Sequence, residues 1–175
     1  CYKLTDITMP NKLKSIGDGV FYQCVDLSDL TLADSVEYVG GSTFAETNLS
    51  NVHFPSNVKS VGKNPFADTP YAKNNIYNNG LYWGNWLVGY NKKYDQDATY
   101  VVIKKGTEHI ANSTFFQFYI KGKLIIPDGI KTIGDGAFAY NSFDEIVMPD
   151  SVTYVGEAAF TYGYDLKKIV LSKNL

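Results

Sequence analysis

The sequence predicts a repeat solenoid: a β-rich right-handed superhelix with a parallel sheet, short helical turns and one inserted β-hairpin. The main observation is a recurring pattern. LIIPDGIKTIGDGAF at positions 124–138 returns as IVMPDSVTYVGEAAF at 146–160 and as ITMPNKLKSIGDGVF at 7–21. A second observation is that the glycine and phenylalanine columns of this pattern keep one spacing along the chain. Self-similarity at a fixed period is the sequence signature of stacked supersecondary units, so the period predicts the architecture.

The phenylalanine column sets the length of the unit. Its members are Phe21, Phe44, Phe66, Phe115, Phe138 and Phe160, at steps of 23, 22, 49, 23 and 22 residues. These steps predict a single domain over 1–175, with about six units of 22–23 residues and a partial seventh. The long step marks an insertion after Phe66. Because Cys1 lies one repeat length before Cys24, we also expect the chain to be a fragment of a longer protein.

Each part of the unit has a predicted structure. In residues 4–9 we expect a strand in which Leu4, Ile7 and Met9 point toward the core and Asp6 and Thr8 point outward, by the alternation typical of strands. Leu13 and Ile16 form a second apolar pair, for which we expect a short strand on the next face. Gly17 allows a tight corner or a positive φ, and Phe21 is expected to fill the interior. One unit cannot bury this much apolar surface alone, so we expect neighbouring units to stabilise each other by stacking.

The insertion, at about 70–97, has a different composition. Asn78-Asn79-Gly80 is a turn signal, and the aromatic segment LYWGNWLVGY at 81–90 reads as one strand of a β-hairpin. We expect this hairpin to fold against the edge of the solenoid. Trp83 and Trp86 have two interpretations: they form the core of the hairpin, or they form a platform on which a sugar ring stacks.

Composition excludes several functions. All 16 basic residues are lysine and the formal net charge is −2, so the chain lacks the arginine forks and the basic stripe that recognise nucleic acid. No apolar run reaches the roughly 18 residues needed to span a membrane. The two histidines, His53 and His109, fall at different positions of the unit, and no nucleophile, phosphate-loop or HExxH pattern is present. We therefore expect no catalytic residues, no metal site and no cofactor.

The two cysteines leave three interpretations open. Cys1 and Cys24 occupy the same repeat position, so they would be neighbours along the stack. They are then a pair of small buried thiols, as free cysteines often are, or a disulfide. Adjacent rungs lie about 4.8 Å apart, which is within the range of Cα separations that disulfides bridge. A lipidated Cys1 is the third interpretation, and the repeat register disfavours it.

The repeated pattern Leu-x-x-Ile-x-Leu-Pro, Ser-Val-x-x-Ile-Gly, Ala-Phe-x-x-Cys resembles the BspA-like leucine-rich repeats of bacterial surface proteins. Residues 150–156 (DSVTYVG) and Ala159-Phe160 match it nearly letter for letter, and the aromatic insertion is similar to one that recurs in that family. The resemblance covers essentially the whole chain. It implies a secreted or surface-anchored protein of host-associated bacteria, used in adhesion or coaggregation, with no catalytic residues to carry over. The chain departs from the family pattern at its cysteine position, which later units fill with Thr47, Thr69, Phe118, Asn141 and Gly163.

The outward positions of the predicted sheet form the natural binding surface of a repeat scaffold. In the C-terminal half, one outward column reads Tyr100, Lys123, Glu145 and Lys168, and the other reads Val102, Ile125, Val147 and Val170. Strand propensity alone explains a β-branched column. The functional alternative is a contiguous apolar strip rimmed by the first column, because such exposed patches mark contact sites.

The expected function is therefore a non-catalytic extracellular or cell-surface module that binds a host or bacterial surface protein through the exposed face of the parallel sheet. One alternative is a glycan-binding module that uses Trp83 and Trp86. The other is a structural spacer that presents another domain.

Overall fold

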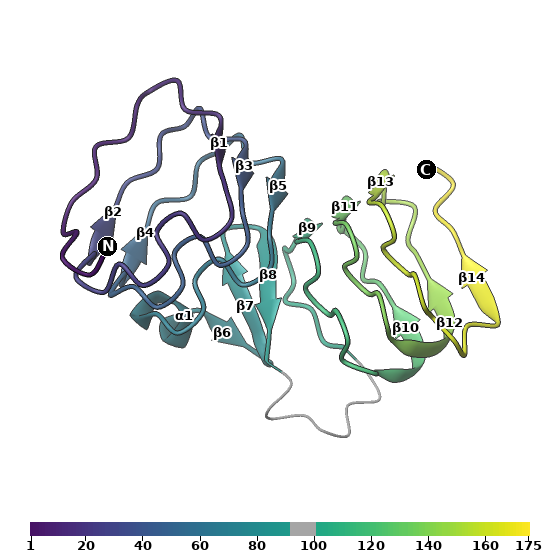
Figure 1. The fold of residues 1–175 in the computed structure, drawn as a ribbon. Helices are drawn as coiled ribbons and strands as arrows, with labels where there is room; N and C mark the ends of the chain where they lie inside the picture. Colours follow the sequence, from purple (N-terminus) through teal and green to yellow (C-terminus); the bar gives the residue numbers. More distant parts are fainter. Residues whose placement is uncertain (92–100) are drawn as a thin grey trace.

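The computed structural model describes residues 1–91 and 101–175, and it shows a β-solenoid with little helix (Figure 1). Each unit contributes a strand to one or both of two faces. The first face contains β2 (Asp29–Leu30), β4 (Asn51–Val52), β10 (Lys121–Ile125), β12 (Ser142–Val147) and β14 (Lys168–Val170). The second face contains β1 (Ser15–Ile16), β3 (Tyr38–Val39), β5 (Ser60–Val61), β9 (His109–Ile110), β11 (Thr132–Ile133) and β13 (Tyr154–Val155). The insertion contains α1 (Pro70–Asn74), β6 (Ile76–Tyr77), β7 (Gly80–Trp83) and β8 (Trp86–Tyr90).

Successive units pair in parallel and in the register that the repeat predicts. On the second face Tyr38 lies between Ser15 and Ser60, and Thr132 lies between His109 and Tyr154. Backbone hydrogen bonds continue this stacking through the corner of the unit, where Phe21 N donates to Thr43 O at 2.9 Å. The predicted parallel solenoid with a short second strand is confirmed, but the strand expected at 4–9 in the first unit is not formed.

The glycine column is explained by close backbone approach and not by positive φ. A Cβ atom added to Gly62 would lie 2.2 Å from Gly41 N, and one added to Gly156 would lie 2.5 Å from Asp135 N. Both distances are too short for any side chain, so glycine lets the backbones of neighbouring units come together. Gly17, which begins the column, would meet only Val20 at 3.7 Å.

The corner after the glycine is a series of turns, where the sequence suggested one helical turn. Two positions in each unit adopt positive φ. The first is filled by Gly19, Ser42, Asn64, Ser113, Gly136 and Ala158. The second is filled by Gln23, Glu46, Asp68, Gln117, Tyr140 and Tyr162. Left-handed backbone at non-glycine residues is uncommon and persists where surrounding structure holds it. The same corner is therefore imposed on each unit by its neighbours.

The entry to the insertion is capped in the usual way for a helix. Thr69 precedes α1, and its Oγ1 accepts a hydrogen bond from Ala72 N at 3.0 Å. Pro70 occupies the first turn, where its missing N–H costs nothing. The chain thus leaves the repeat at Thr69 with its backbone groups satisfied.

The β7–β8 hairpin lies inside the stack and not against its edge, which corrects the expectation from the sequence. The segment 81–90, expected to be one strand, contains residues of both strands of the hairpin and the turn at 84–85 between them. Strand β8 pairs antiparallel with β7 and parallel with β9, and every residue of both hairpin strands is buried. Ala111 N donates to Leu87 O at 2.9 Å, just as Gly134 N donates to Ile110 O at 2.9 Å one unit later. Strand β8 therefore serves as a rung of the second face. We call β7 and β8 together the hairpin wall.

The hairpin wall divides the interior into two cores. Leu81, Trp83, Trp86 and Val88 pack against the N-terminal units, whereas Tyr82, Leu87 and Tyr90 pack against the C-terminal units. The phenylalanine column is correspondingly interrupted. Phe44 stacks between Phe21 and Phe66 at 5.6 and 5.5 Å, and Phe138 stacks between Phe115 and Phe160 at 4.9 and 5.6 Å between ring centroids. The predicted single column is in fact two stacks of three rings.

The cysteines are unbridged. Cys24 is buried and Cys1 is exposed, so the expectation of two buried thiols holds for Cys24 alone. Later residues at the Cys24 position satisfy backbone carbonyls: the Asn141 side chain donates to Phe115 O at 2.8 Å and to Phe138 O at 2.9 Å. A buried amide that bridges two units stabilises the stack where a thiol would only fill space.

Candidate binding surfaces

Three charged side chains lie in register across the first-face strands β10, β12 and β14. Glu145 is the ladder partner of both Lys123 and Lys168. Its two carboxylate oxygens lie 3.2 Å from Lys123 Nζ and 3.0 Å from Lys168 Nζ. The hydrogen bond from Lys168, followed by the one from Lys123, lowers the pKa of Glu145. The structure thus brings together three members of the predicted rim, while the fourth, Tyr100, lies outside the described residues.

The apolar row beside this rim consists of Ile125, Val147 and Val170, which are ladder partners across the same strands. Ile125 is 61% exposed and Val170 is 39% exposed, with Val147 half-buried between them. Three rungs at about 4.8 Å spacing give a strip of roughly 10 Å. Val102, the fourth predicted member, is exposed but lies outside the strands of this sheet. We call Ile125, Val147 and Val170 the apolar strip.

A second ion-paired row crosses the second face. Glu37 lies between two lysines, 2.5 Å from Lys14 Nζ and 2.6 Å from Lys59 Nζ. The hydrogen bond from Lys14, and then the one from Lys59, lowers the pKa of Glu37 from 4.5 to about 2. Farther along, Glu108 lies 2.8 Å from Lys131 Nζ and accepts from the Asn85 amide of the hairpin at 3.0 Å. These rows hold charged side chains in fixed places on both faces.

The lowered pKa of Glu37 predicts a pH-dependent contribution to stability. A carboxylate whose folded pKa lies below its unfolded pKa stabilises the fold above the unfolded value, and this contribution is lost as pH falls through the folded value. For Glu37 the loss should occur between about pH 4.5 and pH 2. Thermal melts should show wild type above Glu37→Gln at pH 6, with the difference shrinking toward zero at pH 2. The exposed Glu157→Gln is the control. A pH-independent difference would contradict the ion-pair assignment.

Trp83 and Trp86 have no open face for a sugar. Trp83 is 1% exposed and is covered edge-on by Phe54 and Phe66, at centroid distances of 5.0 and 5.1 Å. Trp86 is 3% exposed and stacks on His109 at 4.5 Å. This burial contradicts the assignment of a stacking platform to the two indoles, because a platform needs a solvent-facing ring. The alternative, that they form part of the core around the hairpin, describes both.

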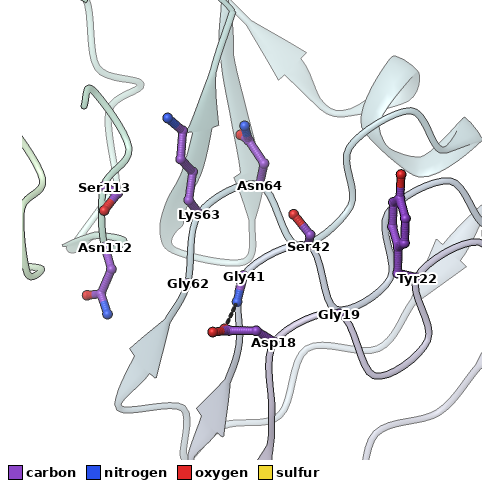
Figure 2. A pocket seen from close by; sticks show the side chains of 10 residues that line it. All are labelled: Asp18, Gly19, Tyr22, Gly41, Ser42, Gly62, Lys63, Asn64, Asn112 and Ser113. Carbon is purple, nitrogen blue, oxygen red and sulfur yellow. Dashed lines mark hydrogen bonds between the residues drawn. The ribbon is translucent and has the colours of Figure 1, made fainter. Parts of the chain in front are cut away.

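A groove of about 920 Å³ follows the corner of the first four units. Figure 2 shows its lining, in which Asp18 accepts a hydrogen bond from Gly41 N at 2.6 Å. The side chains of Lys63 and Asn64 extend away from Asp18 (Figure 2). Lys63 Nζ lies 5.5 Å and 5.6 Å from the ring centroids of Phe116 and Phe118, and burial lowers the pKa of Lys63. The groove is polar, with one cation held by cation–π contacts.

This groove could not be predicted from the sequence, which carries only a partial signal of it. Asp18, Asn112 and Asp135 occupy the same position of the unit, and each accepts a backbone N–H of the next unit. In the second unit this position is filled by Gly41, which has no side chain to do so. Gly41 lines the groove, and a Cβ there would lie 3.2 Å from Lys63 O, so a side chain at this position would crowd the backbone of the third unit.

Titratable side chains with catalytic potential are dispersed. His53 Nε2 lies 3.7 Å from Asp34 on the first face, whereas the His109 ring contacts Thr132 Oγ1 at 2.8 Å on the second. A bulge in the β10–β12 pairing leaves Asp144 and Glu145 as neighbours between two buried residues, Phe143 and Ile146. Within residues 1–91 and 101–175, no three His, Cys, Asp or Glu side chains gather closely enough to hold a metal. No helix in the described parts of the chain is long and apolar enough to cross a membrane.

Comparison with solved structures identifies similar bacterial proteins. The pneumococcal vaccine antigen PcpA is 21% identical, with a TM-score of 0.48, and the match covers 94% of this chain and 44% of PcpA. A leucine-rich repeat protein from Eubacterium ventriosum is 22% identical, with a TM-score of 0.47, and covers 97% of this chain and 54% of its own. A leucine rich cell surface protein from Faecalibacterium prausnitzii is 20% identical, with a TM-score of 0.38, over 92% of this chain and 58% of its own. This chain thus spans about half the length of the first two.

Sequence comparison agrees with the repeat period and with the parallel stack. Among curated proteins there is no significant match. The family described as the BspA type leucine rich repeat region matches in six copies, over residues 1–86 and 88–175. Because the match extends over nearly the whole chain, this protein belongs to the BspA-type leucine-rich repeat family.

Proposed function

We propose that this chain is a non-catalytic module that binds a protein partner through the first face of its C-terminal half. The observation that carries the proposal is the apolar strip. Ile125, Val147 and Val170 align by parallel pairing, and each leaves part of its side chain open to solvent. Contiguous exposed apolar side chains often mark a protein-binding surface, whereas single exposed ones are normal on any protein.

The rim of the strip also suits protein recognition. The Lys123–Glu145–Lys168 row runs beside it, and each lysine is already oriented by Glu145. Protein interfaces combine an apolar centre with a polar, solvent-accessible rim. Charges that are held in place before binding cost less entropy to order in the complex. The first face of the C-terminal half therefore has the composition of a small protein interface.

The proposed location is outside the cell or on its surface, with a host or bacterial surface protein as partner. Support comes from the resemblance to bacterial surface proteins and from the Faecalibacterium prausnitzii protein, which is described as a cell surface protein. The glycan alternative through Trp83 and Trp86 loses its support because both indoles are buried. The spacer alternative stays as an outcome of the test below.

Replacing Ile125 by aspartate is expected to weaken partner binding at least tenfold, or by about 1.4 kcal/mol. The reason is that a carboxylate placed at the centre of an apolar contact must be desolvated without a partner. Partners would first be cross-linked to the immobilised chain in bacterial and epithelial surface-protein extracts, then identified and purified. Their affinity for wild type and variant would be measured by surface plasmon resonance.

Val20→Asp is a matched control, because Val20 is 53% exposed on a corner of the first unit. Both variants should melt within a few degrees of wild type, since neither side chain is buried. Ile125→Asp that binds as tightly as Val20→Asp would remove the apolar strip from the interface. Absence of any saturable partner would favour the spacer.

A further inference from the structure

A second groove lies on the second face of the solenoid, where the hairpin wall interrupts the row of strands. Strands β1, β3 and β5 form one sheet, and β13, β11, β9 and β8 belong to another. Figure 1 shows the two groups, β1-β3-β5 and β9-β11-β13, separated along the same side of the molecule. The groove between them, which we call the crease, has a volume of about 650 Å³. This is within the usual range of small-ligand sites, about 300–1,000 Å³.

The crease is lined by one residue in register from each of the strands β3, β5, β8, β9, β11 and β13. Tyr38 and Ser60 are ladder partners on one side, and Trp86, His109, Thr132 and Tyr154 follow in register on the other. Two of them are exposed aromatic walls, since Tyr38 is 45% exposed and Tyr154 is 55% exposed. Trp86 and His109, stacked at 4.5 Å, are largely covered and form the floor.

Two charged residues line the crease, and each already has a partner. Lys59 is paired with Glu37 at 2.6 Å, and Asp135 accepts a hydrogen bond from Glu157 N at 2.8 Å. Burial lowers the pKa of His109, so its ring is neutral at neutral pH. The uncharged polar groups are the hydroxyls of Ser60, Thr132 and the tyrosines, and the Asn112 amide. Thr132 Oγ1 also contacts the His109 ring, and Asn112 Oδ1 also accepts from Asp135 N. The crease thus combines exposed aromatic rings with uncharged hydrogen-bonding groups.

We propose that the crease binds a neutral carbohydrate chain, with Tyr38 and Tyr154 packing against sugar rings and Ser60, Asn112 and Thr132 hydrogen-bonding to sugar hydroxyls. Tyrosine suits this role because it offers an apolar ring and a polar tip together. The site is independent of the apolar strip, which lies on the other face, and neither Trp83 nor an open face of Trp86 is needed.

The test uses the intact chain of 175 residues and four soluble neutral sugars: maltohexaose, cellopentaose, chitohexaose and mannohexaose. Binding is followed by isothermal titration calorimetry and by tryptophan fluorescence, for which Trp86 in the floor is the reporter. We expect at least one sugar to bind saturably. Tyr38→Ala and Tyr154→Ala should each weaken its binding about tenfold or more, because each removes an aromatic ring that packs against the sugar. A tenfold change corresponds to about 1.4 kcal/mol of binding free energy. Tyr164→Ala is the matched control, because Tyr164 is 76% exposed outside the crease.

Ile125→Asp should leave sugar binding unchanged, so failure of the crease and failure of the apolar strip are told apart. If none of the four sugars binds, or if binding survives in the Tyr38→Ala/Tyr154→Ala double variant, the proposal is overturned. Loss of a protein partner's binding in Tyr38→Ala would also overturn it and assign the crease to protein recognition.

Discussion

Replacement of Phe138 by alanine is expected to lower the free energy of unfolding by about 3–5 kcal/mol, which is the range for buried aromatic side chains cut back to alanine. Phe138 is 1% exposed and is stacked between Phe115 and Phe160 with ring planes 6° and 3° apart. It also meets Phe143 edge-on at 6.1 Å. The substitution removes contacts to both neighbouring units at once and leaves a cavity at the centre of the C-terminal core. Urea denaturation followed by circular dichroism measures the loss.

Phe21→Ala is the matched control for this prediction. Phe21 occupies the same position of the unit, but it stacks on one ring only, Phe44 at 5.6 Å, and it is partly exposed. Its replacement should cost clearly less, because fewer contacts are lost and water can enter the site. Equal losses at Phe21 and Phe138 would show that stacking between units does not set the stability of the column.

Replacement of Trp83 by alanine is expected to have an effect of similar size, about 3–5 kcal/mol. Trp83 is 1% exposed and connects the hairpin wall to the N-terminal core through the edges of Phe54 and Phe66. Its truncation should open a cavity at the junction of the insertion and the third unit. Urea denaturation again gives the difference from wild type.

Trp83→Phe distinguishes packing from polar contacts. The indole Nε1 of Trp83 is buried and has no hydrogen-bond partner among the described residues. Phenylalanine would remove this unsatisfied donor and keep most of the apolar volume, so we expect most of the stability to be retained. If Trp83→Ala stays within about 0.5 kcal/mol of wild type, as surface substitutions do, the hairpin is not part of the core.

Much of the fold could be predicted because equivalent residues recur at a fixed spacing, so that each unit can be aligned with the others. The repeat position of Phe44 and Phe138 predicted that both lie in the interior. The repeat positions of Lys123 and Ile125 predicted that each belongs to a row of residues on one face. The sequence predicted that glycine is needed at this position but not the reason. Positive φ and close backbone approach both favour glycine, and the distance between Gly62 and Gly41 depends on how the units stack.

The position of the hairpin wall could not be derived from the period, since its residues do not repeat. A signal was nevertheless present. Tyr82 and Trp83, and likewise Leu87 and Val88, are adjacent apolar residues, and adjacent residues of a strand point to opposite faces. Such a strand is buried on both sides, as in the interior of a layered fold. The crease could not be predicted either. It forms because β5 and β8 belong to different sheets, and the spacing of residues along the chain does not show where one sheet ends and the next begins.

Hydrogen exchange of the hairpin amides tests the central claim most directly. If β7 and β8 form a wall shared by two cores, peptides covering 80–90 should be protected as strongly as peptides covering 130–138, since exchange there requires opening of the core. Rapid exchange over 80–90, with the repeat units still protected, would show instead a flap on the surface of a continuous solenoid.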